Sequence, residues 1–383
     1  MDPELGAETL AILRKDPLKQ ALTRTTVKDF QISKLFADNK AAITSVDHDL
    51  TGARCVTTSL DESLRIYDCV RGTREHVSYS KKYGCNLAQF TTHPGYIAYA
   101  STKINDTIRY LSYETNQYLR YFVGHKGMVT SLQRSPIPGS GTILSAAMDG
   151  AVNLWDLEQV NPVSVVKPAC GSGGSIAGGG IAAAYDPSGT AIAVAVGSTE
   201  IQLFDVRKMA SGPFMSSPLE SQLTADGAVV AGVQFLPTVG DHMLLVMSNG
   251  TIAVLDAFTL KKQAVLLSAL PGSASTATNS DLDALGKMQK AFLGQNVTAA
   301  PDGKTVIVGG ESGDIAFWHI QEALNSVARN ANGGSGAMPS AVVRPDGSWN
   351  GSHDGPVSAC AFNPHMMECV SGSRSLALWT TAT

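Results

Sequence analysis

The feature of this sequence that most constrains its fold is a short closing pattern that recurs seven times. Each copy has a turn, a short strand of alternating side chains, and then an aromatic residue or Leu followed by a polar residue. The copies read DESLRIYD, NDTIRYLS, DGAVNLWD, STEIQLFD, SNGTIAVLD, SGDIAFWH and SRSLALWT, and they close at positions 67, 111, 155, 204, 255, 318 and 379. Such a period along most of the chain indicates one repeating architecture, not two unrelated domains.

Two further apolar runs precede each closing strand. In the third copy these runs are MVTSL and TILSAAM, which stand ahead of AVNLW. Each unit of about 40–45 residues is therefore predicted to run strand–turn–strand–turn–strand. One small antiparallel sheet buries only part of its surface, whereas seven such sheets packed radially bury their faces against each other. The pattern resembles the WD40 repeat and predicts an all-β, seven-bladed β-propeller.

The ring also needs a closing device. Residues 30–36, FQISKLF, alternate apolar and polar side chains just ahead of the first unit. We expect them to form the outermost strand of the last blade, beside LALWT, so that both ends of the chain share one sheet. The propeller then occupies residues 26–383, and residues 1–25 form an N-terminal extension. This extension is predicted to be either a weak amphipathic helix docked on the ring or a flexible leader.

Three stretches rich in Gly, Ser and Ala interrupt the repeat, at 170–180, 271–287 and 324–352. They account for the longer spacing of the later closing strands. Because their composition is typical of flexible connections, we interpret them as insertions that form loops at the rim, not as further domains.

Composition and motifs exclude several function classes. The chain has 29 basic and 33 acidic residues, a net charge of −4, so direct nucleic-acid binding is not expected. No run of 18 apolar residues predicts a membrane span. The six cysteines form no C-x-x-C pair, and neither a P-loop, nor a G-x-S-x-G elbow, nor an H-E-x-x-H helix occurs. We therefore predict no catalytic residue, no metal site and no cofactor: a non-enzymatic protein.

The third repeat carries a set of residues that resembles the hydrogen-bonded network of WD40 blades. These residues are His125, Ser145, Asp149 and Trp155. A buried Trp N–H needs an acceptor and a buried imidazole needs a partner for each nitrogen, so the resemblance implies a structural role. The last repeat is expected to keep part of this set, through His353 and Trp379.

Two stretches interleave basic and aromatic residues, at 65–84 and 103–125. Such a surface suits an acidic or phosphorylated peptide, because Arg and Lys bind anions and Tyr rings stack. The other interpretation is a solvated loop between the first two blades, with about half of the second stretch in the blade core. The candidate partner-binding residues are Arg65, Tyr79, Lys81, Lys82, Tyr83, Lys103, Arg109, Tyr110 and Arg120.

These stretches also carry a closer resemblance. YSKKYG at 79–84, KINDTIRYLS at 103–112, YLRYFVGH at 118–125 and SGPF at 211–214 are similar to the WD-repeat protein 82 family, which includes the yeast Swd-two subunit. The resemblance runs from about residue 20 to the end of the chain.

This resemblance implies a scaffold in the nucleus, without catalytic residues. Its protein partners would be subunits of a COMPASS-type histone methyltransferase complex, a phosphatase-one targeting subunit or polyadenylation factors of transcription termination, with links to RNA polymerase II. The alternative is a stand-alone reader of phosphorylated peptides such as the polymerase tail. The Gly-rich insertions and the leader depart from the family pattern.

Overall fold

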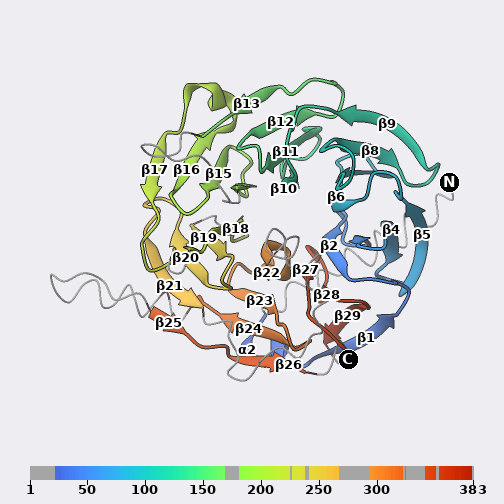
Figure 1. Ribbon diagram of the computed structural model, residues 1–383. Coiled ribbons are helices and arrows are strands. Elements are labelled where there is room, and N and C mark those ends of the chain that lie inside the picture. Colours follow the sequence, from blue (N-terminus) through green and yellow to red (C-terminus); the bar gives the residue numbers. More distant parts are fainter. Residues whose placement is uncertain are drawn as a thin grey trace.

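The computed structural model describes residues 22–168, 181–224, 227–237, 241–266, 293–321, 324, 341–350 and 353–381. In it, seven antiparallel sheets stand around a common centre like the blades of a propeller (Figure 1). The predicted all-β, seven-bladed architecture is confirmed. Among the described residues, no helix has the length and apolar character needed to cross a membrane.

The first four blades are each a continuous run of four strands. Blade one holds β2 (Ile43–His48), β3 (Arg54–Ser59), β4 (Ser63–Asp68) and β5 (Thr73–Tyr79). Blade two holds β6 (Asn86–Phe90), β7 (Tyr96–Ala100), β8 (Ile108–Ser112) and β9 (Gln117–Phe122). Blade three holds β10 (Val129–Arg134), β11 (Thr142–Ala147), β12 (Val152–Asp156) and β13 (Ser164–Val166). Blade four holds β14 (Ile181–Tyr185), β15 (Ala191–Val196), β16 (Glu200–Asp205) and β17 (Met215–Pro218), with the 3-10 turn η2 (Val206–Ser211) before β17.

The last three blades draw on more distant segments. Blade five holds β18 (Val230–Phe235), β19 (His242–Met247), β20 (Ile252–Asp256) and β21 (Lys262–Leu266), and β25 (Ala341–Val343) adds to it in parallel as a fifth strand. Blade six holds β22 (Val297–Ala299), β23 (Thr305–Gly309), β24 (Ile315–His319) and β26 (Gly347–Trp349). Blade seven holds β27 (Ala359–Phe362), β28 (Glu368–Gly372), β29 (Leu376–Thr381) and β1 (Phe30–Phe36).

Each of the first six blades has a fourth strand that the sequence prediction of three strands per unit missed. In blade one this strand is β5, which lies in the stretch for which a solvated loop was one interpretation. The side chains of β5 are exposed or half-buried at all seven positions. An edge strand of this kind lacks the alternation of buried and exposed residues on which sequence-based assignment depends.

Part of the predicted insertion at 324–352 is also strand, not rim loop. Residues 341–343 pair with β21, and residues 347–349 supply the outer strand of blade six. Trp349 is buried there, which explains why a Gly- and Ser-rich stretch is ordered at this point. The insertions 170–180 and 271–287 lie outside the described residues.

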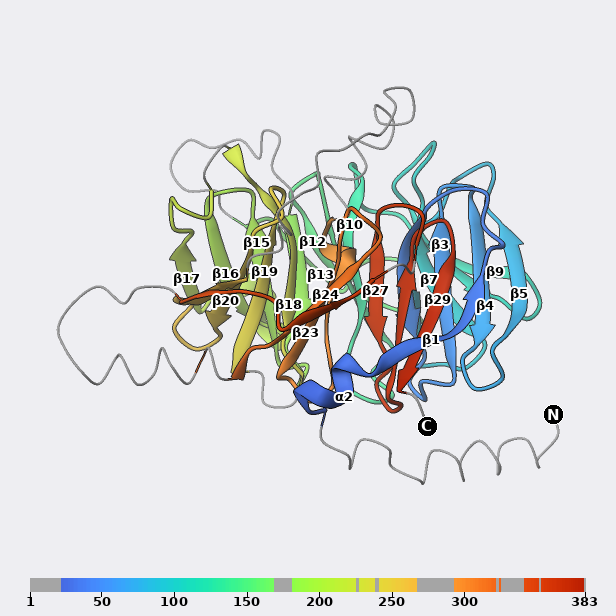
Figure 2. The same ribbon diagram turned by 90° about the horizontal axis from the view of Figure 1, so that it is seen from below.

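Closure of the ring follows the prediction. β1 pairs antiparallel with β29, from Phe30 opposite Thr381 to Phe36 opposite Leu376. The short helix α2 (Arg24–Lys28) precedes β1 and lies against one face of the ring (Figure 2). Of the predicted N-terminal extension 1–25, residues 22–25 are described, and Leu22 is buried with Val27 in the hydrophobic cluster of blades six and seven. Residues 1–21 lie outside the described residues.

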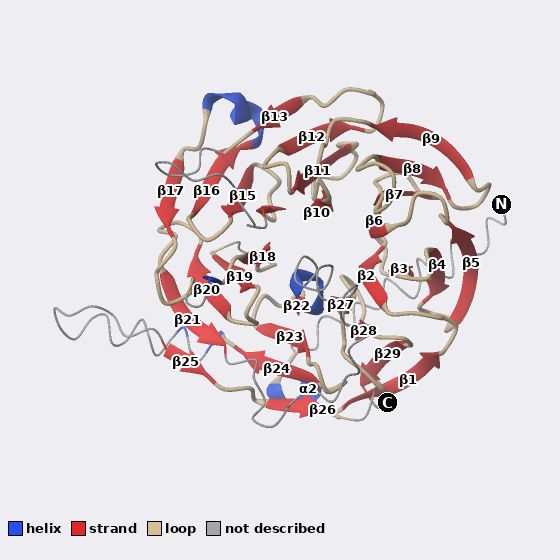
Figure 3. Ribbon diagram, in the orientation of Figure 1, coloured by secondary structure: helices blue, strands red, loops and turns tan. Residues whose placement is uncertain are grey.

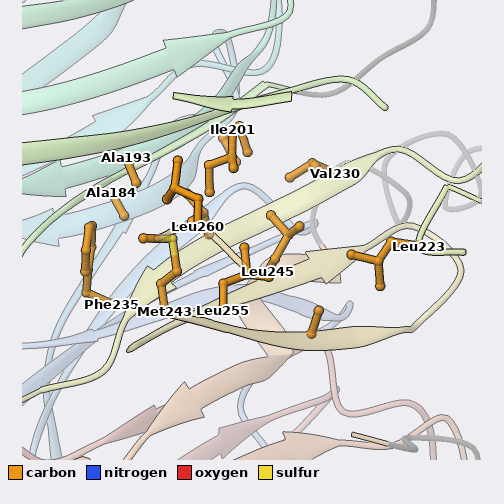
Figure 4. Close-up of a cluster of buried hydrophobic side chains, with 14 of the residues drawn as sticks. Ala184, Ala193, Ile201, Leu223, Val230, Phe235, Met243, Leu245, Leu255 and Leu260 are labelled. Carbon is orange, nitrogen blue, oxygen red and sulfur yellow. The ribbon is translucent and has the colours of Figure 1, made fainter. Parts of the chain in front are cut away.

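The hydrophobic core consists of separate clusters, most of them between neighbouring blades. Figure 4 shows one of them, where Ala184, Ala193 and Ile201 of blade four face Phe235 and Met243 of blade five. Small alanines on one sheet leave room for large side chains on the next, so the two faces pack without a gap. The 3-10 turn η4 (Leu293–Asn296) lies near the centre of the ring (Figure 3). A Cβ on Gly232 would come within 2.8 Å of the Gly294 Cα atom, so this approach requires glycine.

Candidate partner-binding surface

The loops that carry most of the predicted site residues meet at one end of blades one and two. Strand pairing brings Asn86, Ala100, Ile108 and Phe122 to the same end of blade two, so loops 80–85 and 101–107 adjoin. Two amide groups join them, because the N–H groups of residues 102 and 103 both donate to the Tyr83 carbonyl, at 3.0 and 2.7 Å. Blades one and two therefore present a continuous surface here.

Five of the nine predicted binding residues lie at this surface: Tyr79, Lys81, Lys82, Tyr83 and Lys103. We call them the basic–tyrosine surface. Tyr79 is 54% exposed, and Tyr83 is half-buried. The ammonium groups of Lys81 and Lys82 lie 5.7 and 5.1 Å from the ring centroids of Tyr79 and Tyr83. Lys103 forms an ion pair with Glu62 of blade one. Exposed lysines beside exposed rings suit a partner with carboxylate or phosphate groups.

Arg109 lies beneath this surface and is buried. Its guanidinium carbon is 3.6 Å from the Tyr83 ring centroid, 5.0 Å from that of Tyr121 and 5.8 Å from that of Tyr118. Its Nε donates to the Ser101 hydroxyl at 2.9 Å. Arg109 therefore holds three tyrosine rings in place, which is a positioning role seen in the geometry.

The other three predicted residues are engaged in packing. Arg65 is 2% exposed, forms an ion pair with Asp61 at 3.3 Å and donates to the Asp38 carbonyl. Tyr110 is buried between Tyr96 and Phe122. Arg120 is half-buried and donates to the Leu157 carbonyl. Arg65 is therefore covered by its own blade, whereas Arg120 is partly covered and stays a candidate for partner contact.

A neighbouring group of exposed apolar residues was not singled out from the sequence. Ile104, Tyr118, Leu119, Tyr121 and Val123 are between 39% and 74% exposed, and we call them the blade-two rim. Three of them lie on β9, the outermost strand of blade two. The signal was present as the string YLRYFVGH, but period-two alternation alone assigns half of such a string to the core.

In blade three, His125, Ser145, Asp149 and Trp155 form one hydrogen-bonded set. The Trp155 Nε1 donates to the Ser145 hydroxyl at 2.8 Å, and that hydroxyl lies 2.6 Å from the His125 Nε2. The His125 Nδ1 lies 3.4 Å from an Asp149 carboxylate oxygen. The chain of donors is complete when the proton of a neutral imidazole is on Nδ1. Burial lowers the pKa of His125, against the opposing charge of Asp149, and so favours this neutral form.

Blade seven holds a similar set with one replacement. Trp379 donates to the Ser371 hydroxyl at 2.8 Å, which also lies 2.8 Å from the His353 Nε2. The His353 Nδ1 faces the Ser375 hydroxyl at 2.9 Å, where blade three has a carboxylate. Burial lowers the pKa of His353 to about 4. Both sets hold strands together, and the hydroxyls that accept from the tryptophans, those of Ser145 and Ser371, are fully buried.

The remaining groups that could take part in chemistry are the cysteine thiols and the side chains that could bind a metal. Burial raises the pKa of the Cys85 and Cys360 thiols to about 12, so they carry almost no thiolate at neutral pH. Across the described ranges, no three His, Cys, Asp or Glu side chains are grouped as metal ligands would be.

Comparison with known proteins adds to this geometry. Residues 116–156, which contain the blade-three set, match the family WD domain, G-beta repeat. The chain is 31% identical over 362 residues to WD repeat-containing protein 82 of Drosophila melanogaster, covering 94% of this chain and 98% of that protein. It is 29% identical to Set1 complex component swd2 of Schizosaccharomyces pombe, covering 88% and 92% of the two chains. It is also 29% identical to COMPASS component SWD2 of Saccharomyces cerevisiae, covering 84% and 85%.

Proposed function

This chain belongs to the family of WD repeat-containing protein 82, and from that premise we propose that it is a non-enzymatic scaffold subunit of a nuclear complex that acts on chromatin. The observation that carries the proposal is similarity over nearly the whole ring to proteins named as Set1 complex and COMPASS components. Because the similarity extends over most of each relative's length, it reflects a shared propeller and not a single shared repeat.

The geometry is consistent with a docking role. A closed ring of seven sheets has little freedom to deform, so it presents its surface loops in fixed positions. The basic–tyrosine surface joins blades one and two through the Lys103–Glu62 ion pair and the Tyr83 carbonyl. We infer that a partner segment contacts this surface through carboxylate or phosphate groups.

The test is affinity purification of the tagged full-length chain from nuclear extract of its own cells, followed by mass spectrometry. We expect subunits of a Set1-type methyltransferase complex with the wild type. The variant K81E/K82E should recover at least tenfold less. The matched control is R207E/K208E, which makes the same change of charge on exposed residues of η2 in blade four. A wild-type chain that is folded yet recovers no such subunit would overturn the proposal.

The finer assignment concerns transcription termination. We propose that the same scaffold also serves a phosphatase-one complex or a polyadenylation complex, as the family resemblance implies. Recovery of a phosphatase targeting subunit or of cleavage and polyadenylation factors in the same purification would support this assignment. If only methyltransferase subunits are recovered, the termination role is rejected.

A second candidate function is direct reading of phosphorylated peptides, such as the polymerase tail. The observation that favours it is the pairing of Lys81 and Lys82 with the Tyr79 and Tyr83 rings at the surface. Titration of phosphorylated and unphosphorylated tail peptides into the purified chain tests it. Equal affinity for both peptides would reject this function and leave the scaffold role in place.

A further inference from the structure

The blade-two rim differs from the other outer edges of the propeller. β9 is six residues long, and its side chains at Tyr118, Leu119 and Tyr121 are exposed. The outermost strand of a sheet has unpaired N–H and C=O groups along one edge, and proteins usually protect such edges by charge, proline or short length. An edge with large apolar side chains is suited to pairing with another strand.

The remaining edges carry these protections. β13, β25 and β26 have three residues each, and β17 ends in Pro218. β5 has an exposed Arg74, and β1 has an exposed Lys34. In the described part of the chain, β9 is the edge with three large exposed side chains. Its one charged residue, Arg120, is half-buried, and its pairing with β8 shifts register at Leu119.

The chain itself shows that a blade of this ring accepts an added strand. β25 pairs in parallel with the outer edge of β21, with Ala264, Val265 and Leu266 opposite residues 341, 342 and 343. The added segment is held by backbone pairing, by a hydrogen bond from the Trp318 Nε1 to the Val343 carbonyl at 3.3 Å, and by packing of the Val343 side chain against the hydrophobic cluster of blades five and six. Val342 stays 63% exposed, so burial of its side chain is not what holds the strand.

The charge next to β9 indicates the chemistry of the occupant. The three loops at this end of blade two, 80–85, 101–107 and 123–126, carry four lysines, at 81, 82, 103 and 126, and one aspartate, at 106. The net charge of these loops is +3, from four positive and one negative group, and becomes +2 when Glu62, the ion-pair partner of Lys103, is counted as well. A segment with acidic residues at the end that reaches these loops is electrostatically complementary.

We propose that the outer edge of β9 binds an extended segment of a partner subunit as a fifth strand of blade two. The segment has aliphatic or aromatic residues that contact Leu119 and Tyr121, followed by acidic residues that reach Lys81, Lys82 and Lys126. This inference rests on the proposed scaffold function, since it names how that partner is held. Backbone hydrogen bonds provide the affinity, and the rim side chains provide the specificity.

Photo-crosslinking in the intact complex tests where the segment lies. A benzoylphenylalanine in place of Leu119 is compared with one in place of Val165, a 50%-exposed valine on β13 of blade three. We expect the Leu119 probe to label one contiguous stretch of a single partner subunit, and the Val165 probe to label none. Crosslinks to a second copy of the chain, to its own residues 1–21, or equally from both probes would overturn the proposal.

A backbone test then separates strand addition from side-chain docking. A synthetic peptide of the labelled stretch is N-methylated at one position at a time. Alternate positions should lose at least tenfold in affinity and the intervening ones little, because alternate amides of a strand face its neighbour. Uniform tolerance would reject strand addition.

Two double variants complete the design. L119D/V123D should reduce partner recovery at least tenfold with an unchanged melting temperature, whereas V163D/V165D, with Val163 just before β13 and Val165 on it, should not reduce it. If the L119D/V123D complex is recovered intact, the edge proposal fails and the scaffold function stands. If the wild type recovers no complex, the scaffold function itself fails.

Discussion

Blade three and the closing seam of the ring differ in how one buried tryptophan N–H group is satisfied. By the closing seam we mean blade seven, with β1 and α2, and its contacts with blades six and one. In blade three, Trp155 donates to Ser145, which is 10 residues away in the same blade. In the seam, Trp349 donates to the Val27 carbonyl at 2.8 Å, across 322 residues of sequence. The first arrangement can form within one contiguous repeat. The second forms only when the two ends of the chain have met.

The seam has other contacts of this long-range kind. Asn363 donates to the Gly52 carbonyl at 2.7 Å, and the Phe30 ring stacks on Trp349 with 5.1 Å between centroids. Contacts between distant segments form against a larger loop-closure entropy than local ones. We therefore expect the seam to be the first part of the ring to open, and blade three to be among the last.

The largest expected effect comes from breaking the seam with Trp349→Ala. This change removes stacking on Phe30 and on Trp379, whose centroid is 5.0 Å away, and leaves the Val27 carbonyl without its donor. We expect a loss of about 4 kcal/mol in the free energy of unfolding. Urea denaturation measures it, and hydrogen exchange should show faster exchange in β1 and β29 while β11 and β12 are unchanged.

Trp349→Phe is the control for the contribution of the aromatic side chain to packing. It keeps an aromatic side chain in the stack but removes the N–H donor and some of the buried ring volume, so we expect a smaller loss, about 2 kcal/mol. Equal losses for the alanine and phenylalanine variants would show that packing at the seam contributes little. That result would contradict the comparison.

The next largest effect is expected for Ser145→Ala, which breaks the hydrogen-bonded set of blade three. The Trp155 N–H loses its acceptor in a buried site, and His125 keeps only Asn153, at 3.3 Å, beside its Nε2. We expect a loss of about 2 to 3 kcal/mol, with faster hydrogen exchange confined to blade three. Ser371→Ala in blade seven should cost at least as much, because Ala377 stands where blade three has Asn153. Exposed Ser188→Ala should change stability by less than about 0.5 kcal/mol.

The same contrast explains what could be predicted from the sequence. The inner strands and the closing strand 30–36 were predictable, because each alternates apolar and polar residues and repeats at a regular spacing. The blade-three set was predictable as well, since its members lie within one repeat. Local patterns report local structure.

The seam and the surface were harder to predict, for physical reasons. Outer strands such as β5 have little buried side, and the strands at 341–343 and 347–349 are embedded in a Gly- and Ser-rich stretch whose order comes from distant contacts. In the basic–aromatic stretches, lysines stay solvated, whereas Arg65 and Arg109 are buried with partners that no local pattern reveals. The sequence shows where basic and aromatic residues interleave, but not which side of each strand faces solvent.

A buried carboxyl group makes the stability of the seam depend on pH. Glu368 is buried at the seam, where it accepts a hydrogen bond from Asn363 at 3.1 Å. Burial raises its pKa from 4.5 to about 8, with Asp68 adding to the effect and Asn363 opposing it. The native state then holds a proton that the unfolded state releases, so the contribution of Glu368 to stability falls as pH rises from 4.5 to 8.

Glu368→Gln removes this titration. Relative to wild type, the variant should gain about 2 kcal/mol in the free energy of unfolding between pH 6 and pH 8. Urea denaturation of both proteins at the two pH values measures the difference. Parallel stability profiles would mean that Glu368 is ionised in the native seam at pH 6. The Ser145→Ala variant serves as the comparison, because it should show no such gain.

The smallest effect is expected for Asp149→Ser, which gives the histidine of blade three the serine partner that the histidine of blade seven has. Asp149 accepts the backbone N–H groups of Lys126 and Ala151 at 2.7 and 2.9 Å, besides facing His125. Burial opposes its ionisation, but these two N–H groups and His125 together lower its pKa. A serine retains a partner for His125, as Ser375 does for His353, but loses the bonds to the backbone. We expect a loss of about 1 kcal/mol and a further fall in the pKa of His125, followed by NMR titration of its ring protons. Because local contacts hold blade three, hydrogen exchange at the seam should not change; faster exchange in β1 would show that the two regions are coupled.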